Sequence, residues 1–281
     1  MGKKELIGKE FKCLDKGFVR LVDIMGSDES IVQAARVSYG RGTKTVSEDR
    51  NLIRYLMRHR HTSPFEMVEY KFHVKLPIFV ARQWIRHRTA NVNEYSGRYS
   101  IMSDEFYVPS PENVRAQSKV NKQGRSDDPF PEDVALEFIQ DLQQTQSFLY
   151  EKYNNYLSKE IARELARINL PLSTYTEWYW KIDLHNLFHF LELRLHPTAQ
   201  YEIREYAKII ANIVKETCPL AYQAFEDYRL NAVTFSSLEL KILKNMIQYK
   251  LPSFEEMLEM GLTKREVEEF FTKISFINSL K

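Results

Sequence analysis

The chain has 281 residues and a formal net charge of +2, with 43% hydrophobic and 28% charged residues. This balance is ordinary for a globular protein and provides no bulk charge for holding a polyanion. No apolar run reaches the roughly 18 residues of a membrane span, the start at Met1 lacks a signal peptide's apolar stretch, and two cysteines exclude a disulfide framework. We therefore expect a cytoplasmic protein.

Apolar patterning in the first hundred residues predicts both strands and helices. Residues 11–25 are expected to form a strand or a pair of strands, after which Ser27 caps a helix. Ser47 is expected to cap a second helix. Alternation over residues 65–76 predicts a strand, and Pro77 suits the first turn of the helix that follows.

The remainder of the chain has mainly helical patterns. Residues 110–132 are polar and rich in proline, so we expect a loop there. A few strands with many helices indicate an α/β (α+β) fold, and this length suits one large domain with an appendage. Helices are expected at 131–156, 159–168, 183–195 and 198–216, and two capping boxes predict short helices after Ser253 and Thr263.

Residues 82–99 carry four arginines within 17 positions and are the most conspicuous polar segment. Arg82 and Arg86 are four residues apart, so they share one face at a helix end. Arginine binds phosphate through its planar fork, and Tyr95 and Tyr99 can stack on a base. The segment therefore suits a nucleotide phosphate with its base nearby. A solvated basic helix end with surface ion pairs is the alternative interpretation.

The order Arg86-His87-Arg88, seven residues, then Ser96 resembles the signature of the flavin-dependent thymidylate synthases. Further blocks similar to that family follow in the family's order, and the resemblance covers about residues 12–230. These blocks are residues 59–66, 81–84, 94–100, 166–176 and 183–194.

This resemblance implies an enzyme that methylates dUMP to dTMP. Methylenetetrahydrofolate would supply the carbon, and NAD(P)H the reducing power through FAD. It further implies a central, mostly antiparallel sheet flanked by helices, and a homotetramer whose subunits share active sites. Residues 1–231 would form the synthase domain and residues 232–281 a helical C-terminal extension. No glycine-rich dinucleotide fingerprint is present, as expected for FAD held among subunits.

Individual roles are implied residue by residue. Arg194 would contact the uracil ring and assist its activation, and another subunit would contribute Arg167. Positions 183, 185 and 189 depart from the Asn, Arg and Asn of some relatives, and Ser63 replaces a frequent Thr. The implied FAD contacts are Ser63, Arg86, His87, Arg88, Glu94, Asp183, His185 and His189. The implied dUMP contacts are Gln83, Arg86, Glu94, Tyr95, Ser96, Gly97, Arg98, Arg167 and Arg194.

Several of these residues have a simpler interpretation. Ser63 precedes a proline and could be a turn residue; Arg167 could form a surface ion pair with Glu164; and His59 and His61 could be ordinary surface histidines. A nucleic-acid-binding module could use the same arginines and tyrosines, and an inactive relative would bind neither flavin nor dUMP.

A metalloenzyme is a further alternative, because His185, His189, Glu192 and His196 recur on one helical face. Asn186 stands where the zinc hydrolase motif has glutamate, which favours polar contacts to FAD. Cys13 and Cys218 lie outside the signature blocks. We therefore expect dUMP to be activated electrostatically rather than by a thiolate.

Overall fold

The computed structural model describes residues 3–37, 46–119, 123–246 and 251–279. The chain divides into two compact units, Met1–Leu230 and Asn231–Lys281, and each is described by itself. The strands are β1 (Glu10–Cys13), β2 (Gly17–Met25), β3 (Glu69–Pro77), β4 (Asn91–Glu94), β5 (Arg115–Gln117), β6 (Arg125–Pro129) and β7 (Tyr175–Asp183).

Helices are more numerous than strands, and short helical turns separate several of them. In the first unit these are α1 (Lys3–Leu6), α2 (Asp28–Arg36), α3 (Val46–Arg58), η1 (Ser63–Met67), α4 (Ile78–Trp84), η2 (Pro111–Asn113), α5 (Glu132–Ser158), α6 (Arg163–Ala166), η3 (Arg167–Asn169), α7 (Leu184–Leu195), α8 (Tyr201–Thr217), α9 (Pro219–Phe225) and the π-helix η4 (Glu226–Leu230). The second unit contains α10 (Ser237–Met246), α11 (Phe254–Glu259) and α12 (Lys264–Ser279).

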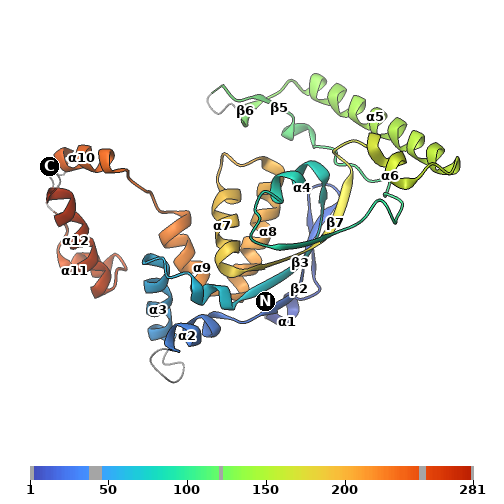
Figure 1. Cartoon of the computed structure of the whole chain (residues 1–281). Helices are drawn as coiled ribbons and strands as arrows, with labels where there is room; N and C mark the ends of the chain where they lie inside the picture. The colour runs from blue at the N-terminus through green and yellow to red at the C-terminus, as the bar shows by residue number, and fades with distance from the viewer. Residues whose placement is uncertain (1–2, 38–45, 120–122, 247–250, 280–281) are drawn as a thin grey trace. The chain divides into compact units, whose positions relative to one another are not determined.

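The first unit is organised around a five-stranded sheet in the order β1-β2-β3-β7-β4. Every neighbouring pair in it is antiparallel. Helices α7 and α8 lie side by side against this sheet (Figure 1). The expected α/β fold with a central antiparallel sheet flanked by helices is therefore confirmed.

An aromatic cluster joins the sheet to its helices. The Trp84 ring of α4 lies 5.6 Å from Trp178 and 5.1 Å from Trp180 of β7, both edge to face. It also stacks on Phe190 of α7 at 4.8 Å and meets Tyr206 of α8 at 5.9 Å. Since aromatic pairs bury large areas in specific geometries, this cluster fixes the end of α4 relative to α7.

Several predicted elements match the structure and others differ. Residues 11–25 form a pair of strands, and Ser27 is the N-cap of α2. Helix α3 begins at Val46, so Ser47 lies in its first turn and does not cap it. Residues 65–67 belong to the turn η1, because Pro64 starts a helical turn before the strand begins at Glu69.

The expected loop at residues 110–132 contains a two-stranded hairpin, β5 with β6. Its strands are polar, so there was no alternation of apolar residues from which they could be predicted. Arg125 ties the hairpin down by donating to the carbonyl of Asn113 at 2.7 Å and to Glu202 at 2.5 Å. Residues 159–168 form only the short helix α6 and part of η3, preceded by a turn in which Glu160 has φ of 60°.

Both capping boxes of the second unit form as predicted. The Ser253 hydroxyl accepts from the Glu256 N–H at 3.1 Å, and the Glu256 carboxylate accepts from the Ser253 N–H at 2.6 Å. Thr263 and Glu266 make the same exchange at 3.3 and 2.8 Å. Among the helices that are described, none is long and apolar enough to cross a membrane.

Candidate functional site

Three consecutive basic residues follow the end of α4, and they differ in exposure. Arg86 and Arg88 are exposed, whereas His87 is only 9% exposed. The backbone N–H of His87 donates to the carbonyl of Trp84 at 2.9 Å, which closes the helix end. The His87 ring then faces α7, with its centroid 5.3 Å from that of His189 and 5.8 Å from that of Phe190.

The surroundings of His87 keep its imidazole neutral. Burial is the main cause that lowers its pKa to about 4, assisted by His189 and Arg194, against a backbone hydrogen bond at Asn186. Its buried Nε2 has no hydrogen-bond partner within the described structure. A buried polar atom without a partner requires an explanation, and a bound ligand would supply one.

Arg194 and Gln83 present two more unsatisfied buried atoms. The Arg194 Nη2 donates to the Gln83 carbonyl at 3.4 Å, a long bond. Arg194 Nε and Gln83 Oε1 have no partner among the described residues. Burial lowers the pKa of the half-buried Arg194 guanidinium. The arrangement offers a cation with spare donors, which suits charge that develops on a ligand.

Asp183 caps helix α7. One of its carboxylate oxygens accepts the Asn186 N–H at 2.9 Å, and the other accepts the Asn186 side-chain amide at 2.7 Å. The helix start is thereby fixed, and His185 and His189 follow on the face that lines a cavity. A cap role for Asp183 was not foreseen from the sequence.

A cavity of about 180 Å³ joins two blocks that are far apart in sequence. The turn after α3 contributes His61 and Thr62, and α7 contributes His185 and His189. Ser63 is exposed and begins η1 beside this turn. Among the described residues, no group of three or more histidine, cysteine, aspartate or glutamate side chains could hold a metal ion.

The second half of the signature forms the edge strand β4 and the turn after it. The Thr176 hydroxyl donates to the Glu94 carboxylate at 2.9 Å, and the Tyr95 N–H donates to the Glu177 carbonyl at 2.8 Å. The turn closes where Tyr99 donates its N–H to the Ser96 carbonyl at 3.1 Å. Strand pairing with β7 thus positions a segment whose side chains are almost all exposed.

Gly97 and Arg167 make close contact within one chain. A Cβ at Gly97 would lie 2.7 Å from Met102 Sδ and 3.1 Å from Arg167 Cδ, so a larger residue would require these side chains to shift. The chain's own Arg167 therefore lies beside the turn that carries Ser96 and Arg98. Glu164 pairs with Arg98 at 3.0 Å rather than with Arg167.

The structure thus sorts the expected site residues into two groups. The first, called the flavin group after the FAD contacts expected in it, comprises His87, His185 and His189, together with Gln83 and Arg194, which were expected to contact dUMP; Arg86 and Arg88 are exposed beside it. The nucleotide group comprises Glu94, Tyr95, Ser96, Gly97, Arg98 and Arg167. Thr176 and Arg60 lie within blocks that resemble the family, but no individual role was expected for either of them or for Arg229. Thr176 donates to Glu94, and Arg60 and Arg229 line the cavity.

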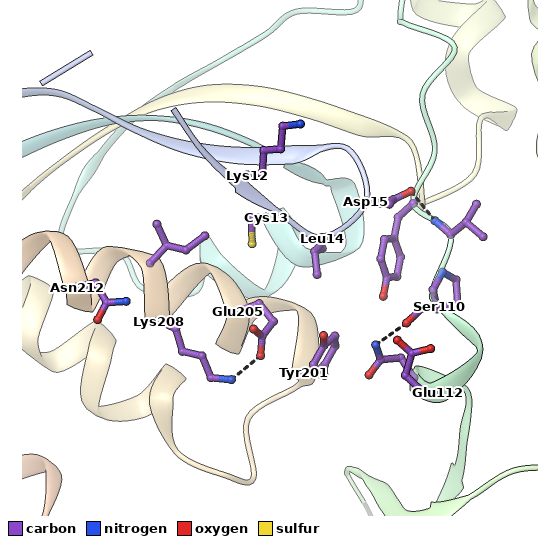
Figure 2. A pocket seen from close by; sticks show the side chains of 15 residues that line it. Lys12, Cys13, Leu14, Asp15, Ser110, Glu112, Tyr201, Glu205, Lys208 and Asn212 are labelled. Atoms are coloured by element: carbon purple, nitrogen blue, oxygen red, sulfur yellow. Dashed lines mark hydrogen bonds and ion pairs between the residues drawn. The ribbon is translucent and has the colours of Figure 1, made fainter. Parts of the chain in front are cut away.

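Neither cysteine is placed to act as a nucleophile in these groups. Cys13 is 4% exposed at a separate cavity of about 520 Å³, where it points from β1 toward Glu205 and Lys208 of α8 (Figure 2). Burial, with the nearby Glu205 carboxylate, raises the pKa of its thiol. Cys218 is fully buried. A buried thiol of raised pKa is a poor source of thiolate.

Comparison with known proteins gives one consistent family. The sequence model described as "Thymidylate synthase complementing protein" matches residues 20–220. Proteins named flavin-dependent thymidylate synthase are similar to this chain in Treponema denticola, at 58% identity over 95% of this chain and 97% of theirs, and in Rickettsia bellii, at 51% over 96% and 95%. A solved UMP/dUMP methylase, PolB of Streptomyces cacaoi bound with 5-Br UMP, superimposes with a TM-score of 0.70 at 34% identity, covering 78% of this chain and 97% of that one. The chain therefore belongs to the flavin-dependent thymidylate synthase family.

Proposed function

We propose that this protein methylates dUMP to dTMP, with methylenetetrahydrofolate as carbon donor and NAD(P)H as reductant through FAD. Relatives that carry the flavin-dependent thymidylate synthase name match nearly the whole chain, and a solved neighbour is a UMP/dUMP methylase. The observation that carries the proposal at residue level is the set of buried atoms on His87, Gln83 and Arg194 that have no partner among the described residues. The His87 ring lies 5.3 Å from that of His189, which lines the cavity on α7, and Arg194 donates to the Gln83 carbonyl.

The residues of the flavin group fit FAD. The neutral His87 ring offers its Nε2 to the flavin, Arg86 and Arg88 are exposed for its phosphates, and His185 and His189 line the cavity. Ser63 and Glu94 complete the proposed contacts, and Asp183 acts by capping α7. When bound there, FAD supplies the hydride that completes the new methyl group.

Arg194 is the proposed catalytic residue. Uracil C5 is a poor nucleophile, so a group must stabilise the negative charge that develops on the ring as the carbon is accepted. Among the residues that the structure describes, the Arg194 Nε has no partner and its guanidinium makes one long hydrogen bond, to the Gln83 carbonyl. Donors already oriented in a half-buried site stabilise such charge without reorganising. Gln83 holds Arg194 and offers its own unpartnered Oε1 to the uracil.

The nucleotide group is the proposed phosphate site. Arg167 packs on Gly97 and points its guanidinium at the turn that carries Ser96 and Arg98. The ion pair of Arg98 with Glu164 is exposed on both sides and therefore contributes little stability. A phosphate can replace Glu164 on Arg98 and accept from Arg167 in addition.

We further propose that the enzyme is a homotetramer with shared sites, working in the cytoplasm. No described hydrogen bond or ion pair joins the flavin group to the nucleotide group, and residues beside the latter, Tyr99 and Ile168, are 79% and 77% exposed. Such large exposed side chains suit an interface that brings the two groups together from different subunits. Two free cysteines fit a reducing compartment.

Mixed oligomers test the shared site. Arg194→Ala damages the flavin group and Arg167→Ala the nucleotide group, so each variant alone should form almost no dTMP. Copies with two different affinity tags, co-expressed and purified through both, should regain activity at about a quarter of the sites if two subunits build each site. Mixed oligomers as inactive as their parents would contradict shared sites. Light scattering with a flavin absorbance scan of the wild type gives the mass and FAD content.

A further inference from the structure

The cavity on α7 contains two arginines that the established signature does not include. Arg60 and Arg229 line it together with the polar residues His185, His189 and Glu192. Neither guanidinium takes part in any hydrogen bond or ion pair across the described ranges of the chain. Two unpaired cations at one small cavity create a positive potential that attracts an anion.

Arg60 occupies a backbone position that favours glycine. It follows α3 with φ of 59°, its N–H donates to Met57 at 3.2 Å, and the His61 N–H donates to Leu56 at 2.9 Å. This is the Schellman ending of a helix, whose left-handed residue is usually glycine. An arginine there costs free energy that no hydrogen bond or ion pair of its side chain offsets among the described residues.

Arg229 is held in place by its neighbours in the π-helix η4. The Arg58 guanidinium donates to the Tyr228 hydroxyl at 3.2 Å, Arg54 lies 4.9 Å over the Tyr228 ring, and Arg54 pairs with Asp227. These contacts hold η4 against α3, and Arg229 of η4 lines the cavity. π-Helical turns are rare and occur frequently at functional sites.

We propose that Arg60 and Arg229 form a phosphate subsite for a dinucleotide bound in this cavity. The inference rests on the proposed function, which requires the enzyme to bind FAD and a nicotinamide dinucleotide. A volume of about 180 Å³ is below the roughly 300 Å³ of a complete ligand pocket, so one group of a larger ligand enters it. Two arginine forks match the oxygens of a phosphate, and Glu192 can accept from a ribose hydroxyl beside it.

The phosphate could belong to FAD or to the reductant, and binding measurements distinguish them. We would compare Arg60→Gly and Arg229→Gln with the wild type. Apoprotein titrated with FAD under fluorescence detection gives the FAD Kd, and turnover at saturating FAD gives separate KM values for NADPH and NADH. Losing a charged hydrogen bond should weaken the dinucleotide concerned by about tenfold or more. The Tm of Arg60→Gly should not fall, because glycine suits φ of 59°.

Glu160→Gly is the matched control. Glu160 follows α5 with φ of 60°, and it has the same pattern of backbone bonds as Arg60. Its N–H donates to the Leu157 carbonyl at 3.0 Å, and the Ile161 N–H donates to the Tyr156 carbonyl at 3.1 Å. Unlike Arg60, Glu160 does not line the cavity. It should raise or preserve Tm in the same way and leave every Kd and KM unchanged.

Each pattern of results has one meaning. If only the FAD Kd rises, the subsite binds a phosphate of FAD. If only the KM for NADPH rises, the subsite binds the 2′-phosphate of NADPH. If the KM values for NADPH and NADH both rise, the subsite binds the pyrophosphate that they share. Unchanged constants, or a change confined to the folate KM, would overturn the phosphate subsite while a dTMP-forming wild type upholds the function. A wild type that binds no flavin would overturn both.

Discussion

Replacing Arg194 by alanine removes the guanidinium that we assign to the charge developing on uracil. The fold should tolerate the change, because within the described part of the chain the side chain makes a single long bond, to the Gln83 carbonyl at 3.4 Å. That bond contributes about 1 kcal/mol or less to the free energy of unfolding. The unpartnered Nε and the lowered pKa of Arg194 indicate that the protein keeps a cation in an unfavourable place. Such sites are typical of catalysis.

Loss of one preorganised donor costs about a hundredfold to a thousandfold in turnover, or roughly 3–4 kcal/mol of transition-state stabilisation. Arg194→Ala should therefore lose dTMP formation by this factor and retain FAD. Arg194→Lys keeps the charge without the planar fork, so it should fall between alanine and the wild type.

The assay should follow both tritium release from C5-labelled dUMP and dTMP formed per FAD-loaded enzyme. Both should fall together in Arg194→Ala at unchanged flavin content. Near-normal tritium release would show that Arg194 is an ordinary charge at the end of a helix, and the assignment of the catalytic role would then be wrong.

Three further predictions follow from buried groups. The double variant Cys13→Ser/Cys218→Ser should retain most activity per folded, FAD-loaded enzyme, because no thiolate is required. A folded double variant that binds FAD and dUMP but forms no dTMP, and that regains activity when either cysteine is restored, would refute this. Cys→Ala at each position controls for the buried hydroxyl. His87 binds a proton below its ordinary pKa of 6.5 in the unfolded chain, but only below a pKa of about 4 in the folded protein. The apoprotein should therefore lose stability as pH falls from 6.5 to about 4, which a series of Tm measurements against pH would show. The Tm of His87→Gln should fall less steeply over this range. Asp28 accepts hydrogen bonds from the N–H groups of Leu220 and Ala221 in the first turn of α9, at 2.9 Å each. Asp28→Ala should therefore lower the free energy of unfolding in urea by about 1–2 kcal/mol, and Asp28→Asn by less. Equal urea midpoints for the wild type and both variants would contradict a capping role for Asp28.

The sheet was only partly predictable from sequence. Strand β7 carries a readable alternation, since Trp178, Trp180 and Ile182 are buried and the residues between them are exposed or half-buried, yet it was not predicted as a strand. Strand β4 has the sequence Asn-Val-Asn-Glu and lies at the sheet edge with every side chain exposed. It exists because β7 offers it backbone partners, which no local pattern reveals.

The candidate site divides in the same way. The signature from Arg86 to Ser96 could be found because its residues are contiguous and resemble a family. The cavity could not, because packing brings α7 against the turn after α3 and places η4 beside it. Arg60 and Arg229 look like surface charges in the sequence, and only their shared cavity distinguishes them from Arg54 and Arg58, which have partners.

We conclude that this chain forms dTMP through a bound flavin. The most direct measurement incubates the purified protein with dUMP, methylenetetrahydrofolate and NADPH, with and without removal of FAD, and quantifies dTMP while the flavin absorbance is recorded. We expect a yellow protein whose dTMP formation stops when FAD is removed and returns when FAD is restored. A colourless protein that FAD cannot reconstitute, or dTMP formation that persists without flavin, would contradict it.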